Sequence, residues 1–253
     1  MDQQELSKTQ FGSRAQNYLN SPVHAKGGDI DRLEARVREM RSPEVLDLGC
    51  GAGHASFALA RGGAGRVVAY DPSPDMLAVV AREAQVRQAG AIETCVGPAE
   101  VVPFASGSFD LVVCRHSAHH WASVARALAE CARVLKPRGS LVVIDSVAPE
   151  SPLLDTALQV FEFLRDASHV RDYRVSEWSG MLGAAGFQIS SMSRWKIPLD
   201  FESWVERIGT PAPRVEALKA VFAGFTAGVK EYFQVSAKLS FAIDAAWMEA
   251  TLA

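Results

Sequence analysis

Three glycines at alternating positions, Gly49, Gly51 and Gly53, follow a short apolar run and directly precede a predicted helix. The apolar run ends near Asp47, and a second run farther along the chain ends in Asp71. Glycine lets the backbone turn sharply and approach a ligand with no Cβ in between. A strand, a glycine-rich turn and a helix form the nucleotide-binding corner of open α/β sheets, where an acid after the second strand holds ribose hydroxyls. This spacing therefore predicts a nucleotide site.

The spacing of the glycines also distinguishes between kinds of nucleotide. A dinucleotide-binding loop needs G-x-G-x-x-G, whereas this loop reads G-x-G-x-G and continues with His54. No G-K-[ST] follows, which excludes a phosphate-binding P-loop. The carboxylate of Asp47 would repel a pyrophosphate but can help to bind a cationic group. The loop therefore favours a ligand other than a dinucleotide, and a structural turn that binds nothing is the alternative.

Histidines form a second set of candidate residues, because their pKa near neutrality suits proton transfer. The chain has six, at positions 24, 54, 116, 119, 120 and 169. His116, His119 and His120 directly follow a predicted strand, at the end where open α/β sheets bind ligands. Structural interpretations remain: His116 can be a hydrogen-bonding partner, and His119 or His120 can face solvent at the start of a helix. Because no carboxylate stands at metal-ligand spacing from them, we expect no metal site.

Composition limits the classes of protein to which this chain can belong. Of its 253 residues, 48% are hydrophobic and 22% charged, which is enough apolar surface for a packed core. The net charge of −3 gives no electrostatic footprint for nucleic acid. No apolar run approaches the roughly 20 residues of a membrane span, and the acidic first residues are unlike a signal peptide. The four cysteines have no zinc-binding spacing, and together these features predict a cytoplasmic protein.

Alternating strands and helices are expected to position the candidate residues between 44 and 146. Continuously apolar runs, typical of parallel strands covered on both faces, predict strands at 44–48, 66–70, 92–96, 109–114 and 140–146. Ser73 before Pro74 predicts the start of a helix. Val124, Leu128, Cys131 and Leu135 have helical spacing, and 136–139 is predicted to end that helix.

The regular alternation of predicted strands and helices ends after residue 147, and the spacing of apolar residues there indicates a different arrangement. This spacing predicts helices around 154–164 and 176–185, a strand at 187–197, helical segments within 201–230 that Pro211 and Pro213 interrupt, and a last strand at 239–251, antiparallel to its neighbour. One or two further helices are expected within 5–40. We therefore predict one domain over 1–253, with leading helices at 1–40, a cofactor-binding core at 41–147, and a substrate cap with the terminal strands at 148–253.

Several motifs together resemble one family over nearly the whole chain. The segment 44–53, EVLDLGCGAG, resembles the first motif of class I S-adenosylmethionine-dependent methyltransferases, and 70–77, YDPSPDML, resembles the second. The segments 97–104, 109–113 and 133–139 are similar to the third, fourth and fifth motifs. Within this superfamily the chain resembles ubiquinone- and menaquinone-biosynthesis-type methyltransferases, and most of all a branch of uncharacterised small-molecule methyltransferases. The likeness to that branch rests on Tyr18-x-x-Ser21-x-x-His24, Ala118-His119-His120 and Arg165-Asp166-x-Ser168-His169.

The resemblance implies a fold and an activity. The fold would be α/β, a Rossmann-like and mostly parallel seven-stranded sheet with an antiparallel last strand, helices on both faces and a helical cap. The activity would be methyl transfer from S-adenosyl-L-methionine to a small-molecule acceptor. An NAD-dependent oxidoreductase and a cofactor-binding module without transfer activity are the alternatives.

The resemblance also assigns residues to the cofactor. The backbone of Gly49 and Gly51 would face its methionine part, with Asp47 near the ammonium group. Asp71 would accept hydrogen bonds from both ribose hydroxyls. The remaining residues that the resemblance places around this part of the cofactor are Cys50, Pro72 and Arg115.

The adenine would lie against a separate group of residues. Met76 would pack on the ring, although simple core packing is its alternative role, and Ala99 and Glu100 would lie at the ring's edge. Pro98, also assigned to this site, is a departure, because family members often carry Asp there. Proline offers no side-chain acceptor to the adenine amino group, so backbone contacts from Ala99 would have to substitute.

The resemblance extends to the methyl acceptor. Because a base assists transfer to a hydroxyl, an acidic carbon or a protonated amine, His119 or His120 is expected to be that base. The residues that it implies for acceptor binding are Tyr18, His24, His116, Arg165 and His169. A solvated surface pair is the alternative role of Arg165 with Asp166. Aromatic residues are frequent in the last third of the chain, which favours an apolar or aromatic acceptor.

Overall fold

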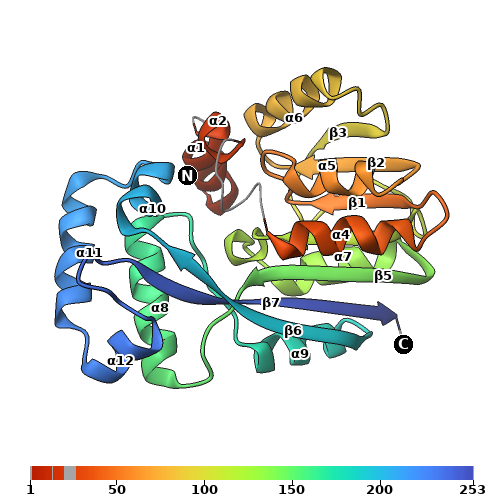
Figure 1. Ribbon diagram of the computed structural model, residues 1–253. Coiled ribbons are helices and arrows are strands. Elements are labelled where there is room, and N and C mark those ends of the chain that lie inside the picture. The colour runs from red at the N-terminus through yellow and green to blue at the C-terminus, as the bar shows by residue number, and fades with distance from the viewer. Residues whose placement is uncertain (1, 13, 20–26, 253) are drawn as a thin grey trace.

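Seven strands form one sheet in the order β3-β2-β1-β4-β5-β7-β6 (Figure 1). The structure is a computed structural model that describes residues 2–12, 14–19 and 27–252. The strands are β1 (Glu44–Leu48), β2 (Arg66–Asp71), β3 (Ile92–Val96), β4 (Phe109–Arg115), β5 (Leu135–Ser146), β6 (Phe187–Leu199) and β7 (Phe241–Leu252). β1 to β5 pair in parallel, whereas β7 is antiparallel to both of its neighbours. The predicted sheet, with its antiparallel last strand, is confirmed.

Helices cover both faces of the sheet, because its central strands are apolar on both sides. On one face Leu33 and Leu59 belong to the same buried cluster as Val45, and on the other Leu128 belongs to the same buried cluster as Leu46, the next residue of β1. The helices before β5 are α1 (Gln3–Gly12), α2 (Ala15–Leu19), α4 (Gly28–Arg38), α5 (His54–Arg61), α6 (Pro74–Val86), the 3₁₀ helix η1 (Ala118–His120) and α7 (Val124–Val134). Those after β5 are α8 (Pro152–Arg165), α9 (Val175–Ala184), α10 (Phe201–Ile208), α11 (Ala212–Gly224) and α12 (Ala227–Tyr232).

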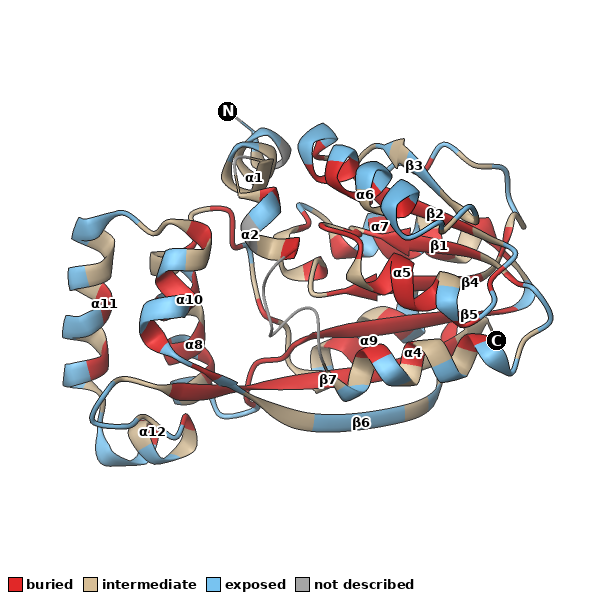
Figure 2. Cartoon of the chain, turned by 45° about the horizontal axis from the view of Figure 1, so that its top comes forward, coloured by how far each residue is buried: buried red, intermediate tan, exposed pale blue. Residues whose placement is uncertain are grey.

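The β6–β7 hairpin reaches beyond the parallel strands and carries a separate group of helices (Figure 1). The two strands pair from Phe187 opposite Leu252 to Leu199 opposite Phe241, and α10, α11 and α12 connect them. With α8, these helices enclose an apolar cluster centred on Phe161, which is fully buried. We call α8, α10, α11 and α12 the cap. Figure 2 shows buried residues along β5 and β7 and on the sides of the helices that face them.

Local signals in the sequence predicted some element ends and missed others. Ser73 caps α6, where its hydroxyl accepts a hydrogen bond from the amide of Met76, as expected. The prediction that Leu135 belongs to the last turn of a helix was wrong, because Leu135 pairs with Phe109 and begins β5. Pro213 does not interrupt a helix, since it lies in the first turn of α11, where proline is tolerated. No helix in the described part of the chain is both long and apolar enough to cross a membrane.

Candidate active site

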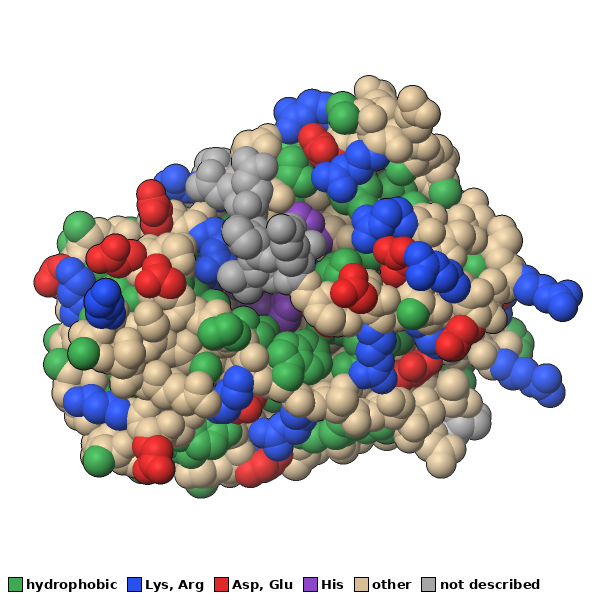
Figure 3. Space-filling model, viewed as in Figure 1, with side chains coloured by type: hydrophobic (Ala, Val, Ile, Leu, Met, Phe, Trp, Pro, Cys, Tyr) green, Lys and Arg blue, Asp and Glu red, His purple; other side chains and the backbone are tan. Residues whose placement is uncertain are grey.

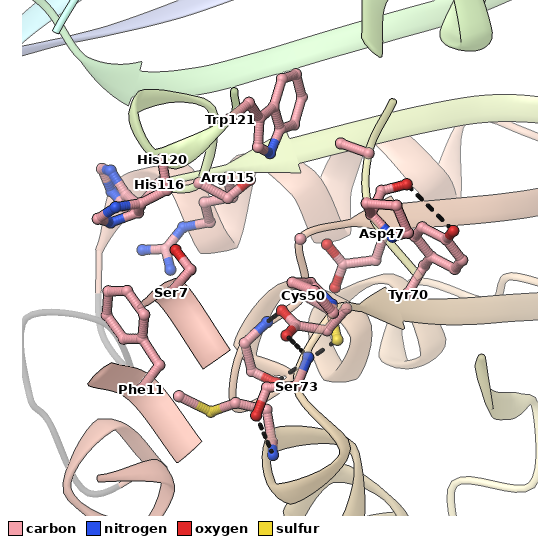
Figure 4. A pocket seen from close by; sticks show the side chains of 18 of the residues that line it. Ser7, Phe11, Asp47, Cys50, Tyr70, Ser73, Arg115, His116, His120 and Trp121 are labelled. Carbon is pink, nitrogen blue, oxygen red and sulfur yellow. Dashed lines mark hydrogen bonds between the residues drawn. The ribbon is translucent and has the colours of Figure 1, made fainter. Parts of the chain in front are cut away.

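A pocket of about 1070 Å³ opens at the carboxyl ends of β1, β2 and β4. We call it the first pocket. Figure 4 shows Ser7 and Phe11 of α1 facing His116 and His120 on one side of it. The residues that line it from the core include every cofactor residue expected from the sequence: Asp47, Gly49, Cys50, Gly51, Asp71, Pro72, Met76, Pro98, Ala99, Glu100 and Arg115. Ser7, Lys8 and Phe11 also line it and were not predicted, because nothing in the sequence fixes where an N-terminal helix docks.

The glycine loop of the first pocket has the left-handed backbone that glycine favours, with φ of 75° at Gly49, 51° at Gly51 and 85° at Gly53. A Cβ at Gly49 would collide with the Ser117 side chain. A Cβ at Gly51 would meet no atom within 4 Å, so this glycine presents bare backbone to open space. The loop therefore combines tight packing at one glycine with room for a ligand at another.

Asp71 holds the loop in place and still faces the first pocket. Its Oδ2 accepts a hydrogen bond from the amide of Gly51 at 2.9 Å, and its Oδ1 accepts one from the amide of Ser73 at 2.8 Å. Burial raises the pKa of this carboxyl to about 6. Because a carboxylate oxygen can accept more than one hydrogen bond, both oxygens can also accept from vicinal hydroxyls, as a ribose would supply.

Asp47 presents an unsatisfied oxygen at the wall of the same pocket. Its Oδ2 accepts from the Ser56 hydroxyl at 2.5 Å, but its buried Oδ1 has no hydrogen-bond partner among the described residues. Burial raises the pKa of this carboxyl to about 6 as well. A buried carboxyl oxygen without a partner is costly unless a ligand satisfies it, and an ammonium group would do so. The first pocket therefore fits a ligand with a nucleoside at Asp71 and a cationic group at Asp47.

Other residues of the first pocket are already held by protein contacts. Nε of Arg115 donates to Oδ2 of Asp29 in the first turn of α4 at 2.5 Å, a partner that was not predicted from the sequence. Oε1 of Glu100 accepts from the amide of Ser123 at the start of α7, and the carbonyl of Pro98 accepts from the Tyr70 hydroxyl. These contacts shape the pocket wall without filling it.

Comparisons with known proteins agree with this geometry. Residues 46–143 match the family model described as a methyltransferase domain. The chain is 42% identical over 184 residues to the uncharacterized protein YafE of Escherichia coli (strain K12). The aligned residues make up 73% of this chain and 89% of YafE. The chain is 36% identical over 209 residues to the uncharacterized methyltransferase YcgJ of Bacillus subtilis (strain 168), covering 82% of each. The crystal structure of YcgJ matches with a TM-score of 0.83 at 31% identity, over 89% of this chain and 99% of that one.

The chain belongs to the class I S-adenosylmethionine-dependent methyltransferases. Its activity is methyl transfer from S-adenosylmethionine, and the comparisons give no support to the oxidoreductase alternative. A demethylmenaquinone methyltransferase of Lactococcus lactis is 30% identical over 157 residues, 60% of this chain and 62% of that protein. The orphaned oxygen of Asp47 and the open face of Gly51 fit the family's cofactor, which carries an ammonium group and a ribose.

The methyltransferase has a second pocket, of about 660 Å³, between the sheet and the cap. Phe11, Tyr18, His116 and His120 line both pockets, so the two meet at these side chains. The residues that line the second pocket alone are His119, Ser146, Glu162, Arg165, Asp172, Ile197, Leu199, Trp204, Arg207 and Ile243. In Figure 3, histidine side chains are visible at the surface between the sheet and the cap.

His119 is held in its protonated form by a carboxylate. Its Nδ1 lies 2.6 Å from Oδ1 of Asp145, near the end of β5. Burial alone would lower the pKa of His119, but the charge of Asp145 and the hydrogen bond to it outweigh burial and raise the pKa to about 9. The methyltransferase therefore keeps a cationic imidazole in the second pocket at neutral pH. Asp145 was not predicted as a site residue, although an acid near the carboxyl end of a predicted strand was a usable signal.

His120 has the opposite protonation state. Burial and the charge of His119 lower its pKa to about 4, so the ring is neutral at neutral pH. Its Nδ1 lies 3.1 Å from the carbonyl oxygen of Ser168, which can only accept, so Nδ1 carries the hydrogen and Nε2 the lone pair. The Phe11 ring meets the His120 ring edge-on at 4.8 Å between centroids.

The remaining predicted acceptor residues have different positions. His116 lines both pockets with a left-handed backbone, φ 50°, and burial with the charge of Arg115 lowers its pKa to about 4. His169 lines neither pocket, and its Nε2 contacts Oε1 of Gln159. Arg165 and Asp166 are not a solvated surface pair, since Asp166 is buried and little of the Arg165 side chain is exposed. His24 lies outside the described residues.

Proposed function

We propose that this methyltransferase methylates a small molecule bound in the second pocket, and that Nε2 of His120 takes the proton that the acceptor loses. The observation that carries the proposal is the meeting of the two pockets at Phe11, Tyr18, His116 and His120. In this proposal 41–147 binds the cofactor, 148–253 holds the acceptor, and the leading helices within 1–40 cover both.

Residues of the first pocket would hold the cofactor by accepting hydrogen bonds beyond those that the protein itself donates to them. Asp71 would accept from the ribose hydroxyls, and Oδ1 of Asp47 would accept from the ammonium group. When bound, S-adenosylmethionine supplies a methyl group that its sulfonium centre already makes electrophilic. The protein's main contribution is then to hold the acceptor in line with that group and to exclude water.

The two neighbouring histidines would divide the remaining work. Neutral His120 accepts a proton at Nε2, whereas protonated His119 donates a hydrogen bond to the acceptor and stabilises negative charge on it. The negative charge of Asp145 keeps His119 in that state. His116, at the junction of the pockets, would contact the acceptor next to the reacting atom.

The test is to incubate the purified protein with S-adenosylmethionine and separate pools of metabolites, RNA, protein and lipid vesicles, and to measure S-adenosylhomocysteine formed. The proposal expects turnover with a metabolite fraction and none with the macromolecules. At limiting S-adenosylmethionine, Asp71→Ala should lower that turnover, whereas exposed Asp75→Ala should not. Methylation of RNA or protein alone would refute a small-molecule acceptor, and cofactor binding without turnover of any pool would indicate a binding module.

A further inference from the structure

Two routes of hydrogen bonds connect His119 with Asp172 in the wall of the second pocket. On the first route, Nδ1 of His119 contacts Oδ1 of Asp145 on β5. The next residue of that strand, Ser146, donates its hydroxyl to Oδ1 of Asp172. On the second route, the carbonyl oxygen of His119 accepts from the amide of Arg171, the residue before Asp172, at 3.2 Å. Because His119, Ser146 and Asp172 all line the pocket, these contacts place His119 and Asp172 at neighbouring positions in its wall.

Asp172 is held in place and still has one unsatisfied oxygen. Gln159 of α8 binds both of its backbone groups, since Oε1 of Gln159 accepts from the amide at 3.1 Å and Nε2 donates to the carbonyl at 2.7 Å. Oδ2 of Asp172, in contrast, is buried and has no hydrogen-bond partner among the described residues. Burial raises the pKa of this carboxyl to about 6, so most of it is ionised at neutral pH. A buried carboxylate oxygen without a donor is costly, and a group bound in the second pocket can supply that donor.

His119 offers the complementary atom. Its Nδ1 is engaged by Asp145, and because the ring is protonated at neutral pH, Nε2 carries a hydrogen as well. Within the part of the chain that the structure describes, Nε2 forms no hydrogen bond, and 17% of the side chain is exposed. The wall therefore provides one acceptor, Oδ2 of Asp172, and one donor, Nε2 of His119. We call these two atoms the donor–acceptor pair.

The donor–acceptor pair distinguishes between the groups that a methyl acceptor could carry. An ammonium group could donate to Asp172, but it has no lone pair with which to accept from His119. A carboxylate could accept from His119, but it has no hydrogen to donate to Asp172. A hydroxyl satisfies both atoms, because it accepts one hydrogen bond while it donates another, and a carboxamide does the same.

The position of the pair assigns it to anchoring rather than to the reacting atom. His119 and Asp172 line the second pocket but not the first, whereas the two pockets meet at Phe11, Tyr18, His116 and His120. A group bound by the pair would therefore lie away from that junction. A different atom of the acceptor would then receive the methyl group.

We infer that the methyl acceptor carries an uncharged group that both donates and accepts a hydrogen bond, a hydroxyl or a carboxamide, which Oδ2 of Asp172 and Nε2 of His119 bind. The rest of the acceptor lies against the apolar side chains of Ile197, Leu199 and Ile243, which line the same pocket. This inference rests on the proposed function, since it describes the occupant of the second pocket. An amine held by Asp172 alone is the competing class.

The test measures binding rather than turnover, by NMR titration at neutral pH of the protein saturated with S-adenosylhomocysteine. The probes are phenylalkyl compounds of graded chain length that end in a hydroxyl, a carboxamide, a methyl ether, an amine or a carboxylate. At the best chain length, we expect the hydroxyl or the carboxamide to bind at least about tenfold more tightly than the other three, because only these two groups satisfy both atoms of the pair. Comparison of the hydroxyl with the carboxamide identifies which of them the pocket prefers.

Asp172→Asn assigns the preference to the donor–acceptor pair. If the Ser146 hydroxyl keeps its contact with the remaining oxygen, the variant presents an NH₂ group in place of Oδ2, and a donor replaces the acceptor. The variant should lose the preference for the hydroxyl over the methyl ether and bind the carboxylate more tightly than the unmodified protein does. Its affinity for S-adenosylhomocysteine should stay unchanged, which also shows that the variant is folded.

Asp166→Asn is the matched control. Asp166 is likewise buried, and its Oδ2 has no hydrogen-bond partner in the described ranges, but it lines neither pocket. This variant removes a comparable buried charge and should keep the full preference for the hydroxyl or the carboxamide.

The outcomes separate the two proposals. Equal binding of the hydroxyl and the methyl ether, tightest binding of the amine or the carboxylate, or a preference that survives Asp172→Asn would overturn the inference. None of these results would affect a small-molecule acceptor. A protein that methylates only macromolecules would instead refute the proposed function, whichever probes bind.

Discussion

Nδ1 of His119 lies 2.6 Å from Oδ1 of Asp145, and this buried contact joins the segments at the carboxyl ends of two neighbouring strands, β4 and β5. Oδ2 of Asp145 also accepts from the amide of Ala118, which opens the 3₁₀ helix that carries His119. The carboxylate therefore fixes both the position of the imidazole and its proton. A carboxylate of β5 thus keeps a side chain of the second pocket positively charged.

Asp145→Asn should lower the pKa of His119 below its ordinary value, because burial then acts without an opposing charge. The pKa of His119 is raised from 6.5 to about 9 in the folded protein, so protonated His119 stabilises the folded state. This stabilisation is complete below pH 6.5 and is lost as the pH rises through about 9. The variant should lose that alkaline decline and about 1–3 kcal/mol of stability at neutral pH. NMR titration of the His119 ring and urea unfolding between pH 6 and 10 measure both. An unchanged titration would show that Asp145 does not control the imidazole.

Asp47 and Asp71 should affect different parts of the bound cofactor. Asp47→Asn should weaken S-adenosylhomocysteine but not 5′-methylthioadenosine, which keeps the nucleoside and lacks the ammonium group. Asp71→Ala should weaken both ligands by about 1–3 kcal/mol, because buried hydrogen bonds lose their partner. Calorimetry with the two ligands measures this pattern, with exposed Asp75→Ala at the start of α6 as the control. Equal effects of both variants on both ligands would contradict separate contacts.

Gly51→Ala should reduce cofactor affinity because the added methyl group occupies space that the cofactor needs, and not because the protein is less stable. The backbone of Gly51 is left-handed, so alanine costs about 1–2 kcal/mol of stability, and its methyl group would enter the open space of the first pocket. Gly186→Ala is a matched control, since Gly186 also has a positive φ and open space but lies outside the pocket. Thermal unfolding should show similar losses for both variants, and only Gly51→Ala should weaken S-adenosylhomocysteine. Normal binding by Gly51→Ala would mean that the cofactor does not approach this glycine.

The core side of the first pocket was predictable from the sequence, because its residues lie in short segments at the carboxyl ends of parallel strands, which meet at one edge of the sheet. The glycines at 49–53 and Asp71 follow neighbouring strands, so the topology alone brings them together. The second pocket was less predictable. Arg207 and Glu162 come from cap helices whose docking depends on long-range packing around Phe161, which no local pattern encodes. Leu135 shows a related limit, since its helical spacing was overridden by pairing with Phe109.

His120 and His119 should differ in how they affect turnover, measured with the acceptor that the metabolite screen identifies. His120→Gln should lower kcat by about 10²-fold, the low end of the usual contribution of a general base, because a base with a pKa of about 4 accepts a proton weakly, and it should not change cofactor affinity. His119→Gln should instead raise KM and remove the alkaline limb of the kcat/KM profile, which we expect near the His119 pKa of about 9. Because the pKa of His120 is lowered to about 4, the base itself should impose no loss of activity between pH 5 and 8. A fall in activity near pH 6.5 that His120→Gln abolishes would show instead that His120 titrates as an ordinary, solvated histidine.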